Sequence, residues 1–195
     1  CYGDSNGVAN AWGAGGTPPY SYNWFDAGVS FSTNDSVTDL RVGSYFVEIT
    51  DALGCDTFTT VNVVQPQTSL TASIQIKDVV CKGDSSGYIV ATAGGSYAPY
   101  SYFWLRGPDT LRAVSNPVNI TRDSLNNLPA GSYELHIYDL WGCFESYSNV
   151  VAEPAIALSS TLNKINDIDC YGDSTGAVQV VVSGGVQSYT YVWND

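Results

Sequence analysis

The chain has 195 residues, and its 19 acidic and seven basic side chains give a formal net charge of −12. This balance argues against nucleic acid as a partner, because phosphate binding needs a basic surface, whereas scattered Asp residues could collect divalent cations. The 14 Tyr, five Trp and 19 Gly, with no Met, are typical of short strands joined by tight turns, and we find no apolar run long enough to span a bilayer.

One motif recurs in order along the chain and predicts a tandem repeat. It reads Cys-Tyr-Gly-Asp-Ser-Asn-Gly from Cys1, Cys-Lys-Gly-Asp-Ser-Ser-Gly from Cys81 and Cys-Tyr-Gly-Asp-Ser-Thr-Gly from Cys170. Each copy continues with Gly-Gly and an aromatic segment, at 20–24, 100–104 and 189–193. The first two copies also carry a Gly-Ser-Tyr segment, at 43–51 and 131–139, followed by Cys55 or Cys143.

The copies end at Gln65-Pro66 and Glu153-Pro154, and an alternating stretch before the next Cys reads as the first strand of the following unit. We therefore expect repeat 1 at 1–66 without its first strand, a complete repeat 2 at 67–154, and a truncated repeat 3 at 155–195. Because the chain opens on Cys1 inside a motif, we also expect it to be a fragment of a longer protein.

Strict alternation of apolar and polar residues predicts strands with one buried face. Many such strands at regular spacing, with turn signals between them and no helical stripe, indicate an all-β fold of tandem immunoglobulin-like antiparallel β-sandwiches. Trp24 and Trp104 should pack between the sheets. The predicted core aromatics of repeat 2 are Tyr100, Tyr102, Trp104 and Tyr133.

The cysteines occupy equivalent places in their repeats, so pairing within each repeat is the economical prediction: Cys1 with Cys55 and Cys81 with Cys143. Loops of this length would disfavour the unfolded chain by about 4 kcal/mol, and such disulfides imply an oxidising, extracellular setting. Cys170 would find its partner beyond Asp195. A zinc site is the weaker alternative, because the cysteines are single and widely spaced.

The order Cys-x-Gly-Asp-Ser-x-Gly, Gly-Gly-x-x-Pro-Tyr-x-Tyr-x-Trp and Leu-x-x-Gly-x-Tyr-x-x-x-x-x-Asp-x-x-Gly-Cys, closing on Gln-Pro or Glu-Pro, resembles the SprB-type repeat of very large Bacteroidetes cell-surface adhesins. It is also similar to polycystic-kidney-disease-type immunoglobulin-like domains. The resemblance implies export by the type IX secretion system, an outer-surface location, and a role in gliding motility or attachment to surfaces and polysaccharides.

Two departures from the pattern stand out: Ser188 replaces the proline of the other copies, and repeat 2 carries an insertion between Trp104 and Tyr133. Its Pro, Asn, Asp and Arg residues predict an exposed loop from about Arg106 to Asn126, which is the first candidate for a specific contact.

The sequence offers few candidate metal ligands or catalytic residues. Asp84 and Asp139 are weak calcium candidates, and the simpler reading is that each Asp bonds the amides of its own turn. No other metal ligand set and no cofactor is expected. With one histidine, His136, on a wet strand face and no Gly-x-Ser-x-Gly elbow, we expect no enzymatic activity.

Exposed aromatics and short hydroxyl motifs point to sugars. Trp12 and Trp141 are candidate platforms for sugar rings, but we favour their partial burial under a neighbouring loop or repeat. Ser36, Thr110 and Ser124 lie in Asp-Ser/Thr-aliphatic triplets that resemble the O-glycosylation signal of Bacteroidetes, in segments expected to be exposed loops. Asn34 and Asn119 begin formal N-glycosylation sequons that we expect to be silent.

These features favour a structural or adhesive segment of a secreted cell-surface protein, in which short Pro-marked junctions build a semi-rigid stalk. The alternatives are a glycan-binding module and a subunit of an extracellular filament completed by strand exchange. The expected partners are neighbouring repeats, surface polysaccharide or further copies of the chain, without nucleic acid or membrane insertion.

Overall fold

The computed structural model describes residues 1–115 and 120–194, and their regular structure is entirely β-strand. The strands are β1 (Gly7–Asn10), β2 (Ser21–Asp26), β3 (Val29–Ser32), β4 (Ser36–Leu40), β5 (Gly43–Thr50), β6 (Asp56–Val63), β7 (Thr71–Lys77), β8 (Gly87–Gly94), β9 (Ser101–Arg106), β10 (Asp109–Val114), β11 (Arg122–Leu128), β12 (Gly131–Tyr138), β13 (Phe144–Val151), β14 (Ser159–Asn166) and β15 (Ala177–Ser183). The predicted all-β class is confirmed. No helix with the length and apolar character of a membrane span occurs in the described residues.

The chain packs as two compact units. Unit 1 comprises Cys1–Thr71 together with two loops, Gly94–Ala98 and Asp139–Cys143. Unit 2 comprises Ala72–Ala93, Pro99–Tyr138 and Phe144–Asp195. Unit 1 therefore contains two loops that the sequence assigns to repeat 2. The repeat boundaries at 66 and 154 stay a prediction.

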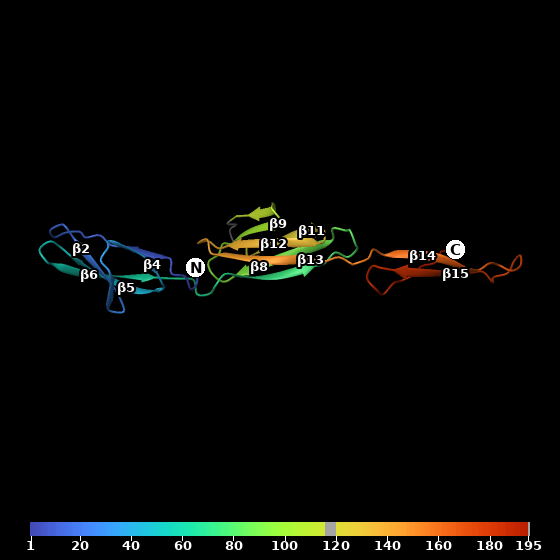
Figure 1. Cartoon of the computed structure of the whole chain (residues 1–195), viewed down its shortest axis with the longest axis horizontal. Coiled ribbons are helices and arrows are strands. Elements are labelled where there is room, and N and C mark those ends of the chain that lie inside the picture. The colour runs from blue at the N-terminus through green and yellow to red at the C-terminus, as the bar shows by residue number, and fades with distance from the viewer. Residues whose placement is uncertain (116–119, 195) are drawn as a thin grey trace. The chain divides into compact units, whose positions relative to one another are not determined.

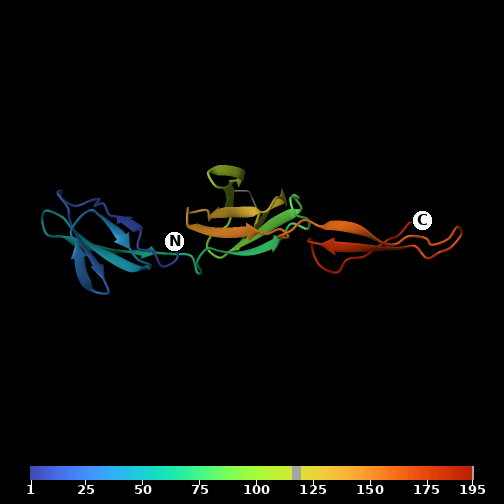
Figure 2. The same ribbon diagram turned by 45° about the vertical axis from the view of Figure 1, so that its right-hand side comes forward.

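The described residues of unit 2 form three sheets: β14 pairs antiparallel with β15, and the other two sheets form a sandwich (Figures 1 and 2). One sheet has the order β11-β8-β7 and the other the order β10-β9-β12-β13. The first, second and fifth strands of this repeat thus share one sheet, and the third, fourth, sixth and seventh share the other. The grouping is that of an immunoglobulin-like domain whose fourth strand has joined the sheet of the third, sixth and seventh strands.

Alternation along the strands places the core of unit 2 between these sheets. The side chains of Trp104, Leu135 and Ile137 are fully buried, and so is Ile89 on β8 of the opposite sheet. The four aromatics singled out in the sequence are all buried in the structure: Tyr100, Tyr102, Trp104 and Tyr133.

A tyrosine near the start of the sixth strand anchors each of the first two copies. The Tyr45 hydroxyl donates to the Arg41 carbonyl at 3.1 Å, and the Tyr133 hydroxyl donates to the Pro129 carbonyl at 2.7 Å. Immunoglobulin-like domains carry this tyrosine corner at the same strand and pair it with a buried Trp on the third strand. Trp24 is 1% exposed and Trp104 is 0% exposed on the third strand of their copies, so the predicted immunoglobulin-like fold is confirmed.

The sandwich of unit 1 repeats this plan with a smaller first sheet. Its sheets have the orders β1-β4 and β3-β2-β5-β6. Trp24 and Val47 from the larger sheet pack with Ala9, Val37 and Leu40 from the smaller one. The pairing of β2 with β5 aligns Trp24 with Val47, as that of β9 with β12 aligns Trp104 with Leu135.

The structure corrects two expectations about strands. The segment from Arg106 to Asn126 is not one loop, because it contains β10 and most of β11; each is hydrogen-bonded into a different sheet. Its residues 116–119, including the sequon residue Asn119, lie outside the described residues. The third aromatic segment, 189–193, forms no strand. Its counterparts pair with a Gly-Ser-Tyr strand, and the sequence carries no third segment of that kind.

Candidate functional site

The repeated Cys-x-Gly-Asp motif forms the same tight turn in all three copies. The amide of Asp4 donates to the carbonyl of Cys1 at 3.3 Å, and the corresponding bonds from Asp84 and Asp173 measure 3.0 and 3.1 Å. The glycine at the third position has a φ of 82° in the first copy, which a type II turn requires and glycine adopts without strain. This turn precedes the second strand and presents the cysteine at its first position.

A side chain from the end of the same copy fastens this turn. Gln65 Oε1 accepts from the Gly3 amide at 2.9 Å, and Glu153 Oε2 accepts from the Gly83 amide at 2.7 Å. The Gln-Pro and Glu-Pro pairs that mark the ends of the repeats thus have a structural role that the sequence reading missed. The signal was present, because both residues occupy the same place in their copies.

The second repeated turn, Asp-x-x-Gly-Cys, closes the hairpin between the sixth and seventh strands. Asp139 Oδ1 accepts from the amides of Trp141 and Cys143, each at 2.8 Å, and Asp51 Oδ1 accepts from those of Leu53 and Cys55, each at 2.9 Å. These bonds match the reading in which each Asp binds its own turn.

The hydrogen bonds to backbone amides, above all that of Cys55, lower the pKa of Asp51 below its usual value. They stabilise the ionised carboxylate, so the turn is held most firmly when Asp51 is charged.

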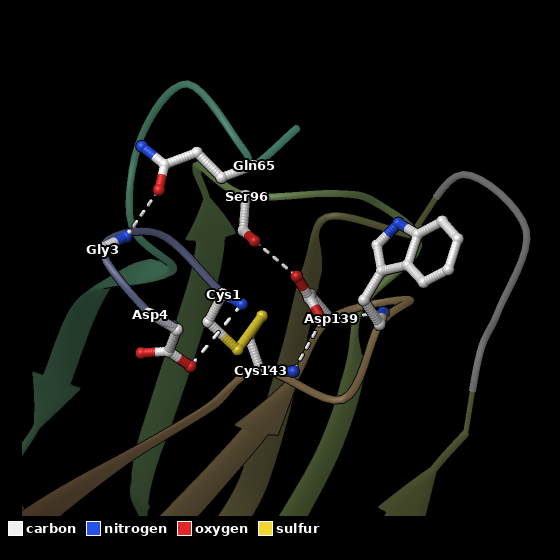
Figure 3. Close-up of polar contacts among 8 residues, drawn as sticks. Cys1, Gly3, Asp4, Gln65, Ser96, Asp139 and Cys143 are labelled. Atoms are coloured by element: carbon white, nitrogen blue, oxygen red, sulfur yellow. Dashed lines mark hydrogen bonds and ion pairs between the residues drawn. A yellow bond between two sulfur atoms is a disulfide. The ribbon is translucent and has the colours of Figure 1, made fainter. Parts of the chain in front are cut away.

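A disulfide joins the two kinds of turn across copies. Cys1 is bonded to Cys143 with their Cα atoms 5.4 Å apart, whereas Cys55, Cys81 and Cys170 are unpaired and exposed (Figure 3). The predicted pairs Cys1–Cys55 and Cys81–Cys143 are therefore corrected. Only two of the four expected cysteines are bonded, and they come from different copies.

Strand direction explains why pairing within a copy fails. Cys55 directly precedes β6, whereas the turn of Cys1 lies at the far end of β6, where Gln65 reaches Gly3. The eight residues of β6 span roughly 26 Å at about 3.3 Å per residue. A disulfide needs Cα atoms within about 7 Å of each other. The two cysteines of one copy therefore lie at opposite ends of its sandwich, beyond reach of each other.

The two loops that unit 1 contains from repeat 2 surround the disulfide. The Ser96 amide donates to the Thr68 carbonyl at 3.1 Å, and the Tyr97 hydroxyl donates to the Gln65 carbonyl at 3.3 Å. The Ser96 hydroxyl also binds the second carboxylate oxygen of Asp139 (Figure 3). We call these loops and the connection 65–69 the junction.

The junction is tight at one glycine and open beside it. A Cβ on Gly95 would lie 2.0 Å from the Ser69 carbonyl oxygen, and its φ is 72°, so glycine is required there. Next to the disulfide lies a cleft of about 690 Å³, whose lining includes Val64, Pro66 and Trp141. Tyr97 meets Trp141 edge-on with ring centroids 6.3 Å apart.

The two tryptophans weighed as sugar platforms are both exposed. Trp12 is 77% and Trp141 73% exposed, so the favoured expectation of partial burial is wrong for this structure. An exposed tryptophan ring can stack on the apolar face of a sugar ring.

The hydroxyls of the Asp-Ser/Thr-aliphatic triplets lie on strands, which corrects the expectation of loops. Ser36 and Thr110 are exposed on β4 and β10, whereas Ser124 is half-buried on β11. Ser124 lies between buried Asp123 and buried Leu125, so strand alternation directs its side chain to the outer face of the sheet.

The sequence reading missed an ion pair in unit 2 between the buried carboxylate of Asp123 and the half-exposed Arg112. Asp123 accepts from Trp104 Nε1 at 2.9 Å and from Arg112 Nε at 3.0 Å. The Asp123 carboxylate raises the pKa of the Arg112 guanidinium, chiefly through this hydrogen bond.

The two calcium candidates lie in turns of different units. Asp139 is engaged by its turn and by Ser96, whereas Asp84 lies in the turn of Cys81, which belongs to unit 2. In residues 1–115 and 120–194, no group of three or more His, Cys, Asp or Glu side chains is arranged to hold a metal ion.

Comparisons with known proteins fall on these segments. The SprB repeat family matches residues 73–109 and 162–195. None of the curated proteins matches the chain in sequence.

Several solved structures are similar at low identity. An amphioxus IgVJ-C2 molecule shares 14% identity, with 76% of this chain and 96% of that chain covered and a TM-score of 0.33. The three N-terminal domains of the bacteriophage RB49 outer capsid protein Hoc share 15% identity over 95% of this chain and 70% of that chain, with a TM-score of 0.42. Murine CEACAM1b shares 15% identity, with 68% and 85% covered and a TM-score of 0.32. The strand order is immunoglobulin-like, and two segments of the chain, residues 73–109 and 162–195, are similar to the SprB repeat.

Proposed function

We propose that the chain is a structural and adhesive tandem-repeat segment of a secreted bacterial cell-surface protein, and that its sandwiches build a semi-rigid stalk. The observation that carries this proposal is the bonded state of the connection after copy 1. The carbonyls of Gln65 and Thr68 both accept hydrogen bonds from the 94–98 loop, and the Gln65 side chain holds the turn at Gly3. A connection held by these hydrogen bonds has less conformational freedom than a flexible linker.

Small-angle X-ray scattering of the chain kept reduced, so that the Cys1–Cys143 bond does not tether the two copies, tests the stalk. We expect a narrow distribution of dimensions for the native chain and a broad one after a Gly-Ser-Gly-Ser insertion following Pro66. The same insertion in the exposed turn after Gly107 is the matched control, because that turn lies in the β9–β10 hairpin. A native chain as broad as the Pro66 insertion variant would overturn the proposal.

By the same proposal, the parent protein lies on the outer surface of a Bacteroidetes cell, reaches it through the type IX secretion system, and serves gliding or attachment. SprB repeats occur in cell-surface adhesins, which supports this location. Protease treatment of intact cells should release fragments of the parent protein. Fragments that appear only after lysis would contradict a surface location. The proposed role is mechanical, without catalysis or a cofactor.

Glycan binding is the second candidate function, because Trp141 presents an exposed ring beside the cleft of the junction. Aromatic rings commonly stack on the apolar faces of sugars. We expect the chain to bind on a glycan array and the binding to fall at least tenfold on Trp141→Ala. The equivalent change in copy 1, Leu53→Ala, is the matched control. A blank array, or binding that survives Trp141→Ala, would remove this candidate.

A further inference from the structure

We propose that consecutive copies of this repeat are linked by disulfides in one fixed register. The cysteine of the Cys-x-Gly-Asp turn of each copy bonds the cysteine of the Asp-x-x-Gly-Cys turn of the next copy. Cys1–Cys143 is one rung of this ladder. Cys55 is then the site for the turn cysteine of a preceding copy, and Cys81 and Cys170 are sites for following copies.

The first half of the inference is that Cys81 is presented as Cys1 is. Both residues begin the same turn, and a side-chain oxygen from the end of the same copy fastens it, at 2.9 Å in the first copy and 2.7 Å in the second. In copy 2 this fastening is stronger, because Lys82 also donates to the Ala155 carbonyl at 2.7 Å and lies 3.7 Å from Glu153. Cys81 therefore occupies a formed turn, and its thiol is exposed.

The second half is that Cys55 is presented as Cys143 is. In each loop the cysteine amide donates to the turn aspartate, and the aspartate amide donates to the cysteine carbonyl at 3.0 Å. The second carboxylate oxygen binds the neighbouring Gly-Gly loop in both copies, through the Thr17 amide in one and the Ser96 hydroxyl in the other. The loop around Cys55 is therefore already in the bonded conformation of its counterpart.

Exposure indicates which residues a further copy would cover. Cys143 is 5% and Asp139 3% exposed, and these residues lie where the Cys1 turn docks. In the equivalent loop of copy 1, which has no such turn against it, Cys55 is exposed and Asp51 only partly buried. A Cys-x-Gly-Asp turn from a further copy is the occupant that fits, because the chain contains this pairing once already.

The bond-forming step is thiol–disulfide exchange. Two thiols of adjacent copies lose two protons and two electrons to an external disulfide, which leaves as two thiols. The ladder rests on the turn geometry and not on the stalk proposal, so each can fail without the other. In it every boundary is crossed twice, once by the peptide and once by a disulfide.

Disulfide mapping of the chain as it stands is the first test. After alkylation and proteolysis without reductant, we expect a single linked pair, Cys1 with Cys143, and alkylated Cys55, Cys81 and Cys170. Linked peptides Cys1–Cys55 or Cys81–Cys143 would overturn the register. Cys55→Ser is the matched control and should leave the map unchanged, whereas Cys1→Ser should make Cys143 alkylatable.

A second chain tests the propagation of the ladder. A further copy of residues 67–154 is inserted after Pro154, so that the original Cys81 gains a following complete copy. We expect its linkage to Cys143 of the inserted copy, with Cys1–Cys143 retained. Linkage of Cys81 to Cys143 within the same copy, or an alkylated original Cys81, would overturn the proposal.

The ladder also makes a mechanical prediction for the native chain. When the two ends of the chain are pulled, the Cys1–Cys143 bond carries the force, so the residues within this separation of 142 cannot extend. Only the remainder of the 195-residue chain can lengthen. In single-molecule force spectroscopy, oxidised molecules should release only about a quarter of the length that reduced molecules release. Equal release before and after reduction would contradict the Cys1–Cys143 bond.

Discussion

Replacing Asp123 by Ala should destabilise unit 2 around Trp104. The substitution removes the acceptor of the Trp104 indole N–H at 2.9 Å and of Arg112 Nε at 3.0 Å, and the Trp104 side chain is 0% exposed. A buried donor without a partner costs about 1–3 kcal/mol. The ion pair adds little beyond this, because Arg112 is 49% exposed and solvent screens its charge. We therefore expect a loss of about 2 kcal/mol.

Exchange of the Trp104 indole proton, followed by NMR, reports this loss at the site itself. A loss of about 2 kcal/mol corresponds to roughly thirtyfold faster exchange, since each 1.4 kcal/mol is a factor of about ten. Asp123→Asn should cost less, because its amide oxygen can still accept from the indole. Asp109→Ala, an exposed change on β10, is the control. Unchanged exchange in Asp123→Ala would refute the reasoning.

Three further changes test other parts of the structure. Hydrogen bonds from backbone amides lower the pKa of Asp51 in the folded chain. The ionised carboxylate therefore stabilises its turn above the unfolded-state pKa, and this stabilisation is lost as the pH falls through the folded-state pKa. In NMR titrations the Cys55 amide should become less protected at low pH, and Asp51→Asn should abolish this pH dependence. Gly95→Ala should disrupt the junction, because its Cβ would lie 2.0 Å from the Ser69 carbonyl oxygen, and melting temperature should fall. Burial raises the pKa of Tyr102 in the folded chain. The neutral phenol therefore stabilises the fold below the unfolded-state pKa, and this stabilisation is lost as the pH rises through the folded-state pKa. Tyr102→Phe should shift the alkaline unfolding transition, followed by circular dichroism, to higher pH.

Matched controls separate these effects from general damage. Asp56→Asn should leave the acid response unchanged, because Asp56 is exposed. Gly107→Ala should cost only about 1 kcal/mol for its left-handed backbone, since no atom lies within 4 Å of the added Cβ. An acid response that survives Asp51→Asn, a Gly95→Ala chain as stable as Gly107→Ala, or an unshifted alkaline transition in Tyr102→Phe would contradict the respective argument.

The fold could be predicted from the sequence because its signals are local. Alternation in 131–139 and 100–104 identifies two strands and their buried faces, and the spacing of turn residues marks their ends. These patterns need no knowledge of which strand pairs with which. The strands β10 and β11 were missed because Pro, Asn, Asp and Arg outweighed the short apolar positions between them.

The disulfide register could not be predicted in the same way, because it depends on direction. Equivalent positions in each copy suggest that Cys1 and Cys55 belong together, but β6 runs between them and carries them to opposite ends. An immunoglobulin-like assignment already implies that the start of the second strand and the turn before the seventh lie at opposite ends of the sandwich. Because the two cysteines of a copy occupy these two positions, the immunoglobulin-like topology excludes a disulfide between them.

The insertion in repeat 2 and the ion pair of Asp123 with Arg112 are structurally linked, because the insertion changes the acceptor of the Trp104 indole. In copy 1 the Trp24 indole donates to the backbone carbonyl of Asn34 at 2.8 Å, so no side chain is needed as acceptor. In copy 2 the segment between the tryptophan and β11 is longer, and the carboxylate of Asp123 is the acceptor instead.

A carboxylate in that place is costly without a cation, since a buried charge needs a partner. The register supplies one, because the residue opposite Trp104 on β10 is Arg112, whereas the residue opposite Trp24 on β3 is Ser32. Arg112 thus places a half-exposed cation beside the carboxylate that the longer segment brings. Exchanging Ser32 for Arg in copy 1, where the acceptor is a neutral carbonyl, should for that reason add no protection to the Trp24 indole.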